Sequence, residues 1–586
     1  MVENSLGRLW MLNNPGSSLR ERMEYYIEPD AEHEDFIRIS SPEEITLCDP
    51  ACGSGHILVY AFELLFHMYE ERGYREREIP ELILTKNLAG MEIDSRAAQI
   101  AELALAMCAR EHDRRFFRRG VRADVTVLSS IPLGEDELPG NKKLAEELSH
   151  LGEIGSLLNP SEDEIDELKA AAASCSDDLF AATAKTKLES AAAICEKLSR
   201  RFTCTVANPP YMGSSSFNPF MSKWIKKNYP DVKSDLCTCF IERGFNLAKD
   251  RGYAAMITMQ SWMFLGSFEK MRSSLIGSKS ILSMLHLGPR AFDAIGGEVV
   301  NVTADVVYNG RAACEGAYVR LVDINGSEAK RQKALEAIRN PDCGWFYRRE
   351  AETFKQIPGT PIAYWASDGL LSAMADGVKL SSFGRTSKGI ITGKNDKFIR
   401  LWWECAVGTI GFSSSSVSDL FSGRKWHPCT KGGSYRKWFG NLDSVIDWSN
   451  NGHSVFESAS REGNHAQDYS DELKFKPAIS WSAITSSIPS FRYASNCLSE
   501  HAGMCLFVPE DKIGYMLSLL NSSVSKEYFS LIAPTLNVNA GDVDKFPVLL
   551  SCFNLVDGLF KESRGLSKTD WDSFETSWDF KRHPLV

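Results

Sequence analysis

Short apolar runs alternate with stretches of helical periodicity along the chain from residue 45 onward. This alternation is typical of a doubly wound α/β sheet, in which helices connect parallel strands. We expect strands at residues 45–49, 88–93, 121–128, 202–207, 253–259 and 281–287, followed by an antiparallel pair at 299–308 and 318–324. We expect helices at residues 55–71, 95–110 and about 235–249. The pattern therefore predicts a large, mostly parallel sheet in the first part of the chain.

Two regions depart from this pattern. Residues 141–200 are rich in Ala, Glu, Lys and Leu and nearly free of β-branched runs, which favours a helical hairpin inserted between strands. After about residue 355 the chain is rich in Gly, Ser, Thr and Trp, with short alternating strands and then a last helical stretch. We therefore predict three parts: residues 1–355 with the insertion, a β-rich domain at 356–550 and a helical segment at 551–586.

The composition is that of a large globular protein. The chain has 586 residues, of which 43% are hydrophobic, so its core is larger than one domain usually carries. No apolar run approaches the ~20 residues that cross a bilayer, and the amino terminus does not have the pattern of a secretion signal, so we expect a cytoplasmic protein. Fifteen cysteines are scattered without the spacing of a zinc site, so we expect reduced thiols and no structural metal.

The charge is unevenly distributed. A net charge of −11, taken alone, argues against a polyanionic partner. The acidic excess lies in the first 200 residues, however, and the rest of the chain is neutral to basic, with clusters at residues 223–227 and 424–437. Each cluster taken singly is more simply a solvated surface, yet the distribution leaves a nucleic-acid partner open.

The segment LCDPACGSG, residues 47–55, stands where the first predicted strand meets the first predicted helix. Gly53 and Gly55 allow a ligand to approach the backbone closely, and the amino terminus of the helix favours an anionic group. Asp49 at the strand end would repel a pyrophosphate but attract an amine or a sulfonium. Glycine-rich turns also occur in α/β folds for tight packing, so the prediction of a ligand depends on the acidic residue.

A second acidic residue follows the second predicted strand. In GMEID, residues 90–94, Glu92 is placed to accept hydrogen bonds from both hydroxyls of a ribose. In isolation, an exposed loop carboxylate is the simpler interpretation of this residue. The ribose-binding interpretation is favoured because GMEID ends the next predicted strand after LCDPACGSG, with one predicted helix between them.

The third motif is VANPPYMG, residues 206–213, at the end of the fourth predicted strand. Pro209 and Pro210 fix the backbone and leave a carbonyl unpaired, and Asn208 offers a side-chain carbonyl beside it. These are two acceptors for one amino group, with Tyr211 as a stacking surface. Asn-Pro also occurs in plain turns, but its place after a strand and after the two earlier motifs favours a site.

DPACGSG followed by NPPY resembles the amino-methyltransferases that use S-adenosylmethionine, specifically the adenine-modifying DNA enzymes. More narrowly, the chain resembles the PglX-type adenine-specific DNA methyltransferases of BREX phage-defence systems. The closer match rests on NSLGRLW (4–10), DPACGSGHILVYAFELL (49–65), NPPYMG (208–213), TGKNDKFI (392–399), KGGSYRKWFGN (431–441) and NVNAGDVDKFP (537–547). The resemblance implies an α/β fold: a Rossmann-like S-adenosylmethionine-dependent methyltransferase sheet with a helical insertion, followed by a β-rich target-recognition domain.

The resemblance also implies where the cofactor S-adenosylmethionine is held. Its methionine part would lie at the first motif, its ribose at Glu92, and its adenine near Asp124, which we expect after the third strand. The residues implied at the first motif are Asp49, Ala51, Cys52, Gly53 and Gly55.

For the substrate, the resemblance implies double-stranded DNA with the target adenine flipped out of the helix, which costs a few kcal/mol. Stacking on Tyr211 would offset about 1–3 kcal/mol of that cost. Asn208 and the Pro209 carbonyl would accept hydrogen bonds from the exocyclic amine, and the methyl group would move in line, without a covalent intermediate or a metal. The catalytic residues implied are Asn208, Pro209, Pro210 and Tyr211.

Residues 356–550 resemble the target-recognition part of these enzymes. Lys394, Lys397, Arg436 and Lys437 are the phosphate anchors that we expect in this region. The alternative is a β-rich domain that serves packing alone. Other BREX defence proteins are the further partners that the resemblance implies.

PglX-type enzymes are longer at the amino end and carry there a helix that closes over the cofactor, so we expect this chain to be a short form that lacks this region. Three functions stay open at this stage. The first is an adenine methyltransferase that marks host DNA. The second is a catalytically weak DNA-binding or assembly subunit. The third is a protein glutamine methyltransferase, which shares NPPY but does not usually carry so large a β-rich domain.

Overall fold

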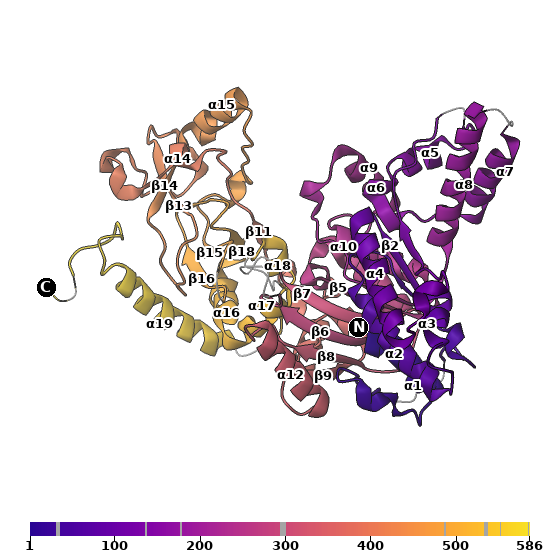
Figure 1. Ribbon diagram of the computed structural model, residues 1–586. Helices are drawn as coiled ribbons and strands as arrows, with labels where there is room; N and C mark the ends of the chain where they lie inside the picture. Colours follow the sequence, from indigo (N-terminus) through magenta and orange to yellow (C-terminus); the bar gives the residue numbers. More distant parts are fainter. Residues whose placement is uncertain are drawn as a thin grey trace. The chain divides into compact units, whose positions relative to one another are not determined.

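The computed structural model describes residues 1–30, 35–134, 137–175, 179–292, 300–485, 488–532, 537–550, 553–583 and 585. The chain divides into two compact units, Met1–Lys355 and Gln356–Val586 (Figure 1). Within the described residues, no helix is long and apolar enough to cross a membrane. Each unit has its own hydrophobic core, so we describe the two separately.

Unit 1 is built on a mixed sheet with the strand order β3-β2-β1-β4-β5-β7-β6-β8-β9. The first five strands of this order run parallel to one another. The strands are β1 (Leu47–Asp49), β2 (Leu88–Glu92), β3 (Val125–Val127), β4 (Phe202–Ala207), β5 (Ala248–Met259), β6 (Ser280–Gly288), β7 (Val302–Tyr308), β8 (Gly316–Arg320) and β9 (Phe346–Arg349).

The strand order fixes the position of the site. From β1 the chain moves outward through β2 to β3, and it then returns to β4 on the other side of β1 and continues to β5. Because crossovers between parallel strands are right-handed, the connecting helices cover opposite faces of the sheet in the two halves. The direction reverses between β1 and β4, and ligands of open α/β sheets bind at such a switch point, beyond the carboxyl ends of the strands.

We predicted that the strands at 299–308 and 318–324 pair with each other, and this pairing is wrong. Residue 299 lies outside the described residues, and the strand β7 begins at Val302. This strand inserts between β5 and β6 and is antiparallel to both, whereas β8 pairs in parallel with β6. The alternating pattern of two neighbouring segments predicts strands but does not show which edge each one joins.

The helices of unit 1 cover both faces of this sheet. Apolar side chains of α2 and α4 join the core that also holds Leu47, Cys204 and Val306 from three of the strands. The helices are α1 (Arg8–Asn13), α2 (His56–Glu71), α3 (Ile79–Leu82), α4 (Ser95–His112), α5 (Lys142–Ser149), α6 (Leu151–Ile154), α7 (Glu162–Ser174), α8 (Leu179–Ser199), α9 (Pro219–Asn228), α10 (Leu236–Leu247), α11 (Glu269–Ser278) and α12 (Ser327–Arg339).

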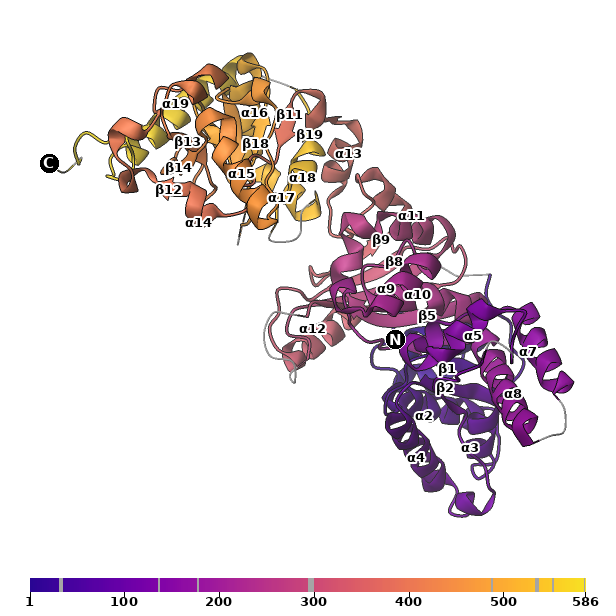
Figure 2. The ribbon, with the colours of Figure 1, turned by 90° about the horizontal axis from the view of Figure 1, so that it is seen from above.

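The segment between β3 and β4 is helical, as its composition predicts. The helices α7 and α8 run side by side, as Figures 1 and 2 show. A capping box at Ser161 and Glu164 starts α7, and Leu168 and Leu188 are buried. A short 3-10 helix, η6 (Gly155–Leu157), precedes this pair.

Among its described residues, unit 2 forms three small sheets, with strand orders β10-β19, β11-β18-β15-β16 and β12-β14-β13-β17. The last helix packs against α16 within this unit. The strands are β10 (Val378–Lys379), β11 (Arg385–Ser387), β12 (Ile399–Leu401), β13 (Trp426–Thr430), β14 (Ser444–Asp447), β15 (Ala478–Trp481), β16 (Phe491–Ala494), β17 (Leu498–Ser499), β18 (Cys505–Phe507) and β19 (Pro547–Val548). The helices are α13 (Asp368–Asp376), α14 (Asn395–Phe398), α15 (His453–Glu462), α16 (Glu510–Asn521), α17 (Ser523–Ile532), α18 (Ala540–Asp544) and α19 (Phe553–Trp571).

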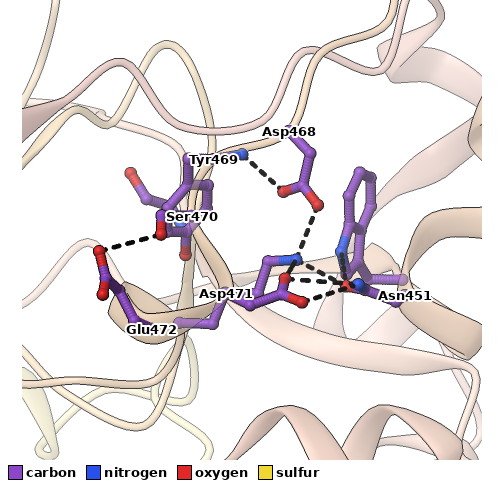
Figure 3. Close-up of polar contacts among 9 residues, drawn as sticks. Asn451, Asp468, Tyr469, Ser470, Asp471 and Glu472 are labelled. Atoms are coloured by element: carbon purple, nitrogen blue, oxygen red, sulfur yellow. Dashed lines mark hydrogen bonds and ion pairs between the residues drawn. The ribbon is translucent and has the colours of Figure 1, made fainter.

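A buried lysine, Lys474, holds the turn before α15. Figure 3 shows the residues that accept its hydrogen bonds, Asn451, Asp468 and Asp471. The Lys474 side chain is fully buried, and its Nζ donates to Asn451 Oδ1 at 2.6 Å, to Asp468 Oδ2 at 2.7 Å and to Asp471 Oδ1 at 2.6 Å. Three acceptors satisfy the three donors of the ammonium group. Asn451, which accepts one of these hydrogen bonds, has a left-handed backbone conformation, at φ +53°.

Candidate active site

The three sequence motifs meet at one edge of the unit 1 sheet. Asp49 ends β1, Glu92 ends β2, and Asn208 follows β4 directly. The register pairs Asp49 with Gly90 and Cys48 with Thr205, so the carboxyl ends of the three strands lie at the same edge. Asp49 and Asn208 therefore flank the switch point between β1 and β4.

Asp49 is a buried carboxylate that faces no cation within the described residues. Its side chain is 1% exposed, and its Oδ1 accepts a hydrogen bond from the Ala51 N–H at 3.1 Å. Burial, with a smaller contribution from the charge of Glu92, raises the pKa of Asp49 to about 7. A buried carboxyl group of this kind gains most from a ligand that brings a positive charge.

Glu92 joins the second strand to the glycine-rich loop. Its Oε2 accepts from the Gly53 N–H at 2.8 Å, and its Oε1 accepts from the N–H groups of Ile93 and Asp94 at 2.8 and 2.9 Å. A carboxylate has about four acceptor positions, so three are used within the protein. Within the described part of the chain one position is left for a hydroxyl donor, and Glu92 also positions the loop itself.

The two glycines of the first motif have different roles. Gly53 has φ +53°, and a Cβ atom at this position would meet no atom of the described residues within 4 Å, so its backbone is open to a ligand. Gly55 has φ +85°, but a Cβ there would lie 2.9 Å from the Ala101 Cβ on α4. We predicted close ligand approach at both glycines, and at Gly55 the close neighbour is a helix of the protein.

Cys52 belongs to the packing beneath the same loop. Its side chain is 6% exposed, and its N–H donates to the Met91 carbonyl at 3.0 Å, next to Glu92. Burial raises the pKa of the Cys52 thiol. The Cys52 side chain is therefore packed in the core, while Ala51 contributes the N–H that holds Asp49. A contact of either residue with the cofactor stays a prediction.

The NPPY segment follows β4 directly. Asn208 is exposed and Pro209 is buried, and among the described residues no hydrogen bond reaches the Pro209 carbonyl. Downstream, the Leu236 N–H donates to the Met212 carbonyl at 2.9 Å, which ties the segment to the start of α10. Two acceptors are therefore held at the sheet edge on a backbone that the prolines stiffen.

Tyr211 contacts the acceptor that precedes it. Its hydroxyl lies 3.0 Å from Asn208 Oδ1 and 3.2 Å from the Ile257 carbonyl of β5. One hydroxyl carries one hydrogen, so it donates to one of these oxygens at a time. Burial raises the pKa of Tyr211. The ring is half-buried, and its hydroxyl can leave Asn208 without losing a partner.

The polar groups at this edge fit S-adenosylmethionine. The buried carboxylate of Asp49 suits the ammonium of the methionine part, the open acceptor position of Glu92 suits a ribose hydroxyl, and the backbone at Gly53 is accessible. Both side chains are acidic, which disfavours a phosphate-bearing ligand at the same place.

Asp124 does not fit the role that we predicted, because it precedes β3 instead of following it. Its carbonyl pairs with the Gly90 N–H, which places it toward the amino end of the strand. Its two carboxylate oxygens pair with Lys197 Nζ and Arg200 Nη1, both at 2.7 Å. These cations outweigh burial and lower the pKa of Asp124. Asp124 therefore anchors the end of α8 to the sheet.

The four basic residues that we predicted to bind DNA all have partners within unit 2. Arg436 pairs with Asp570 at 2.8 Å, and Lys437 donates to the Asn521 carbonyl at 2.6 Å. In the TGKND segment, Lys394 pairs with Glu462 and Lys397 donates to Ser458 Oγ at 2.9 Å. Lys394 and Lys397 are exposed despite these contacts, as is Lys431 in the KGGSY segment, whereas Arg436 and Lys437 are half-buried. DNA binding by the four residues stays a prediction.

Sequence reasoning missed two buried residues, Ser156 and Arg243, whose hydrogen bonds support the first motif. Ser156 of η6 donates to the Pro50 carbonyl at 2.5 Å, and Arg243 of α10 donates to the Ser156 carbonyl at 2.6 Å. Both side chains are 1% exposed. The sequence carries no signal for these contacts, because a serine in a helical insertion and an arginine in a helix look like surface residues.

The strand order, with an antiparallel strand between the fifth and sixth, and the acidic and NPPY motifs at the switch point together define the S-adenosylmethionine-dependent methyltransferase fold. Residues 86–292 match the family model of the Eco57I restriction-modification methylases. The whole chain is 35% identical to the adenine-specific methyltransferase BrxX of Escherichia coli O9:H4 (strain HS) and 34% identical to the adenine-specific methyltransferase PglX of Lacticaseibacillus casei (strain Zhang). Over its entire length the chain is thus similar to adenine-specific methyltransferases named BrxX and PglX, in agreement with its motifs.

The chain spans about half the length of these two relatives, 51% of the first and 52% of the second. Solved structures show the same fold at low sequence identity. The DNA-bound restriction-modification enzyme MmeI matches 99% of this chain with a TM-score of 0.55 at 13% identity, and the match covers 70% of that protein. The restriction-modification enzyme LlaGI, bound to a DNA substrate mimic, matches 89% of the chain with a TM-score of 0.51 at 12% identity and 44% coverage of its own chain.

Proposed function

We propose that the protein transfers a methyl group from S-adenosylmethionine to the exocyclic amine of an adenine in double-stranded DNA. The observation that carries this proposal is the pair of acceptors at the end of β4, next to the acidic loop at the end of β1. The names of the full-length relatives support adenine as the target, and the DNA-bound neighbours MmeI and LlaGI support DNA as the substrate.

In this proposal the cofactor supplies an electrophilic methyl group when it is bound. Asp49 binds its ammonium group and Glu92 accepts from its ribose, while the Gly53 N–H stays fixed by Glu92. Asn208 Oδ1 and the Pro209 carbonyl accept the two hydrogens of the adenine amine, which keeps the nitrogen lone pair directed at the methyl group. Tyr211 supplies the stacking surface for the flipped base, and its hydroxyl moves to the Ile257 carbonyl.

Unit 2 is the DNA-recognition part in this proposal, as the resemblance implies. Its small sheets carry exposed side chains on glycine-rich loops, among them Lys431 and Tyr435, which is 59% exposed. The BrxX and PglX names of the relatives support a place in BREX phage defence, with host-DNA marking as the outcome and other defence proteins as partners.

The test is a methylation assay with nucleoside analysis. The protein is incubated with S-adenosylmethionine and adenine-containing duplex DNA, and the digested nucleosides are analysed by mass spectrometry. The proposal predicts N6-methyladenine in DNA treated with the wild-type protein and about 100-fold less, or none, with Asn208→Ala. Cofactor binding without any methylated adenine would instead support the second candidate, a DNA-binding or assembly subunit.

A further inference from the structure

The helical insertion contacts the DPACGSG loop through the buried side chain of Ser156. Ser156 in η6 donates from its Oγ to the carbonyl of Pro50, in the middle of DPACGSG. The same peptide unit, Pro50–Ala51, donates its N–H to Asp49 Oδ1 at 3.1 Å. The two ends of one rigid peptide plane are thus held by Ser156 and by Asp49.

The turn that carries Ser156 is itself fixed from the other side. Arg243 Nε donates to the Ser156 carbonyl at 2.6 Å, and the Tyr229 hydroxyl donates to the Leu157 carbonyl, also at 2.6 Å. The other partners of Arg243 are the Asn159 side-chain oxygen and the Leu198 carbonyl. All its acceptors are neutral, and burial lowers the pKa of the guanidinium to about 10. Such a buried cation fixes backbone carbonyls without neutralising Asp49.

The turn also packs against the second acidic motif. Gly155 has φ +55°, and a Cβ atom there would lie 3.1 Å from the Cγ2 of Ile93, the residue after Glu92. At its start, the insertion contacts the segment that follows NPPY: Asn218 Nδ2 donates to Glu153 Oε2 at 2.6 Å. The turn at Gly155–Leu157 therefore contacts the loops that carry Asp49 and Glu92. The preceding helix α6 contacts the segment that follows NPPY, through Glu153.

We propose that Ser156 is a positioning residue for cofactor binding, because it fixes the Pro50–Ala51 peptide and thereby the carboxylate of Asp49. The proposal rests on the proposed methyltransferase function. It assigns the helical insertion a role in cofactor affinity, in addition to packing. Ser156 contacts neither the adenine acceptors nor Tyr211 within the described structure, so its effect falls on the cofactor and not on the transfer step.

The test compares Ser156→Ala with a matched control in unit 2. Ser525 is also 1% exposed and donates to a backbone carbonyl, that of Leu520, at 2.6 Å. Calorimetric titration with S-adenosylmethionine is expected to give about tenfold weaker binding for Ser156→Ala and an unchanged Kd for Ser525→Ala. The KM for the cofactor should rise by the same factor, while kcat at saturating cofactor and the KM for DNA stay within twofold of wild type.

Ser156→Cys covers the case in which the alanine variant does not fold, because the thiol has a similar shape and is only a weak donor. Its cofactor affinity should fall below that of wild type, and above that of the alanine variant where the alanine variant folds. Wild-type affinity in a folded Ser156→Ala or Ser156→Cys protein would overturn the inference and leave the proposed function intact. Absence of cofactor binding by the wild-type protein would overturn the proposed function, and this inference with it.

Discussion

The backbone N–H of Gly53 donates to Glu92 Oε2 at 2.8 Å, so the residue expected to bind the cofactor ribose also positions the glycine-rich loop. Two motifs that are 39 residues apart therefore form one unit at the sheet edge. A ligand at this edge meets an arrangement that already exists in the free protein, so little of its binding free energy is spent on ordering the loop.

Asn208→Ala separates transfer from cofactor binding. The substitution removes one of two acceptors for the adenine amine and leaves the contacts of Asp49 and Glu92 intact. We expect kcat to fall by about 100-fold or more, while the Kd for S-adenosylmethionine stays within twofold. Single-turnover methylation assays and calorimetry measure the two quantities, and wild-type transfer by this variant would contradict the catalytic role of Asn208.

Two substitutions separate the contribution of the Tyr211 ring from that of its hydroxyl. In Tyr211→Phe the ring stays, and the hydroxyl that occupies Asn208 Oδ1 is removed. We expect its kcat/KM for DNA to stay within about threefold of wild type, because the adenine amine meets a free acceptor. Tyr211→Ala also loses the stacking surface and should lose about 10- to 100-fold. Equal losses in the two variants would show that the hydroxyl, and not stacking, is what matters.

The affinity for the cofactor should depend on pH through Asp49. Its pKa of about 7 means that it carries a proton in the free protein at lower pH. A bound ammonium group favours the carboxylate, so binding releases this proton below pH 7, and affinity rises with pH up to about 7 and then levels off. Calorimetry at pH 6 in buffers with different ionisation enthalpies should show close to one proton released. Affinity that stays constant from pH 5.5 to 8 would rule out this role.

In unit 2, an exposed lysine and a lysine with a partner should behave differently. Lys431 is exposed, whereas Lys437 donates to the Asn521 carbonyl. We expect Lys431→Met to reduce the salt dependence of DNA binding by about 0.9 in the slope of log K against log salt. Lys437→Met should leave this slope unchanged and lower the thermal stability. Fluorescence anisotropy with duplex DNA at several salt concentrations measures the slope, and an unchanged slope in Lys431→Met would exclude a phosphate contact there.

Sequence patterns predict a helix or strand best where the residues of that one element determine its type and its ends. The strand at 202–207 and the start of α4 after Asp94 follow from local periodicity and a capping residue. The motif residues Asp49, Glu92 and Asn208 come together because parallel strands end at one edge. Asp124 shows the limit of this reasoning: the third strand is predicted at 121–128 but begins at Val125, so Asp124 precedes the strand and lies toward its amino end.

Sequence patterns did not predict the contacts between segments that lie far apart in the chain. The insertion of β7 between β5 and β6 depends on the return path of the chain, and the fit of Gly55 against Ala101 depends on how closely two helices pack. The contact of Ser156 with Pro50 joins residues 106 positions apart, and no local pattern marks either partner. Such contacts are decided by tertiary packing, which local propensity does not encode.

The most direct test of the account is a calorimetric titration of the wild-type protein, Glu92→Ala and Asn208→Ala with S-adenosylmethionine. The account predicts micromolar affinity for the wild type, at least tenfold weaker binding for Glu92→Ala and unchanged binding for Asn208→Ala. Absence of binding by the folded wild-type protein, or equal affinity in all three, would contradict a cofactor site at the ends of β1 and β2.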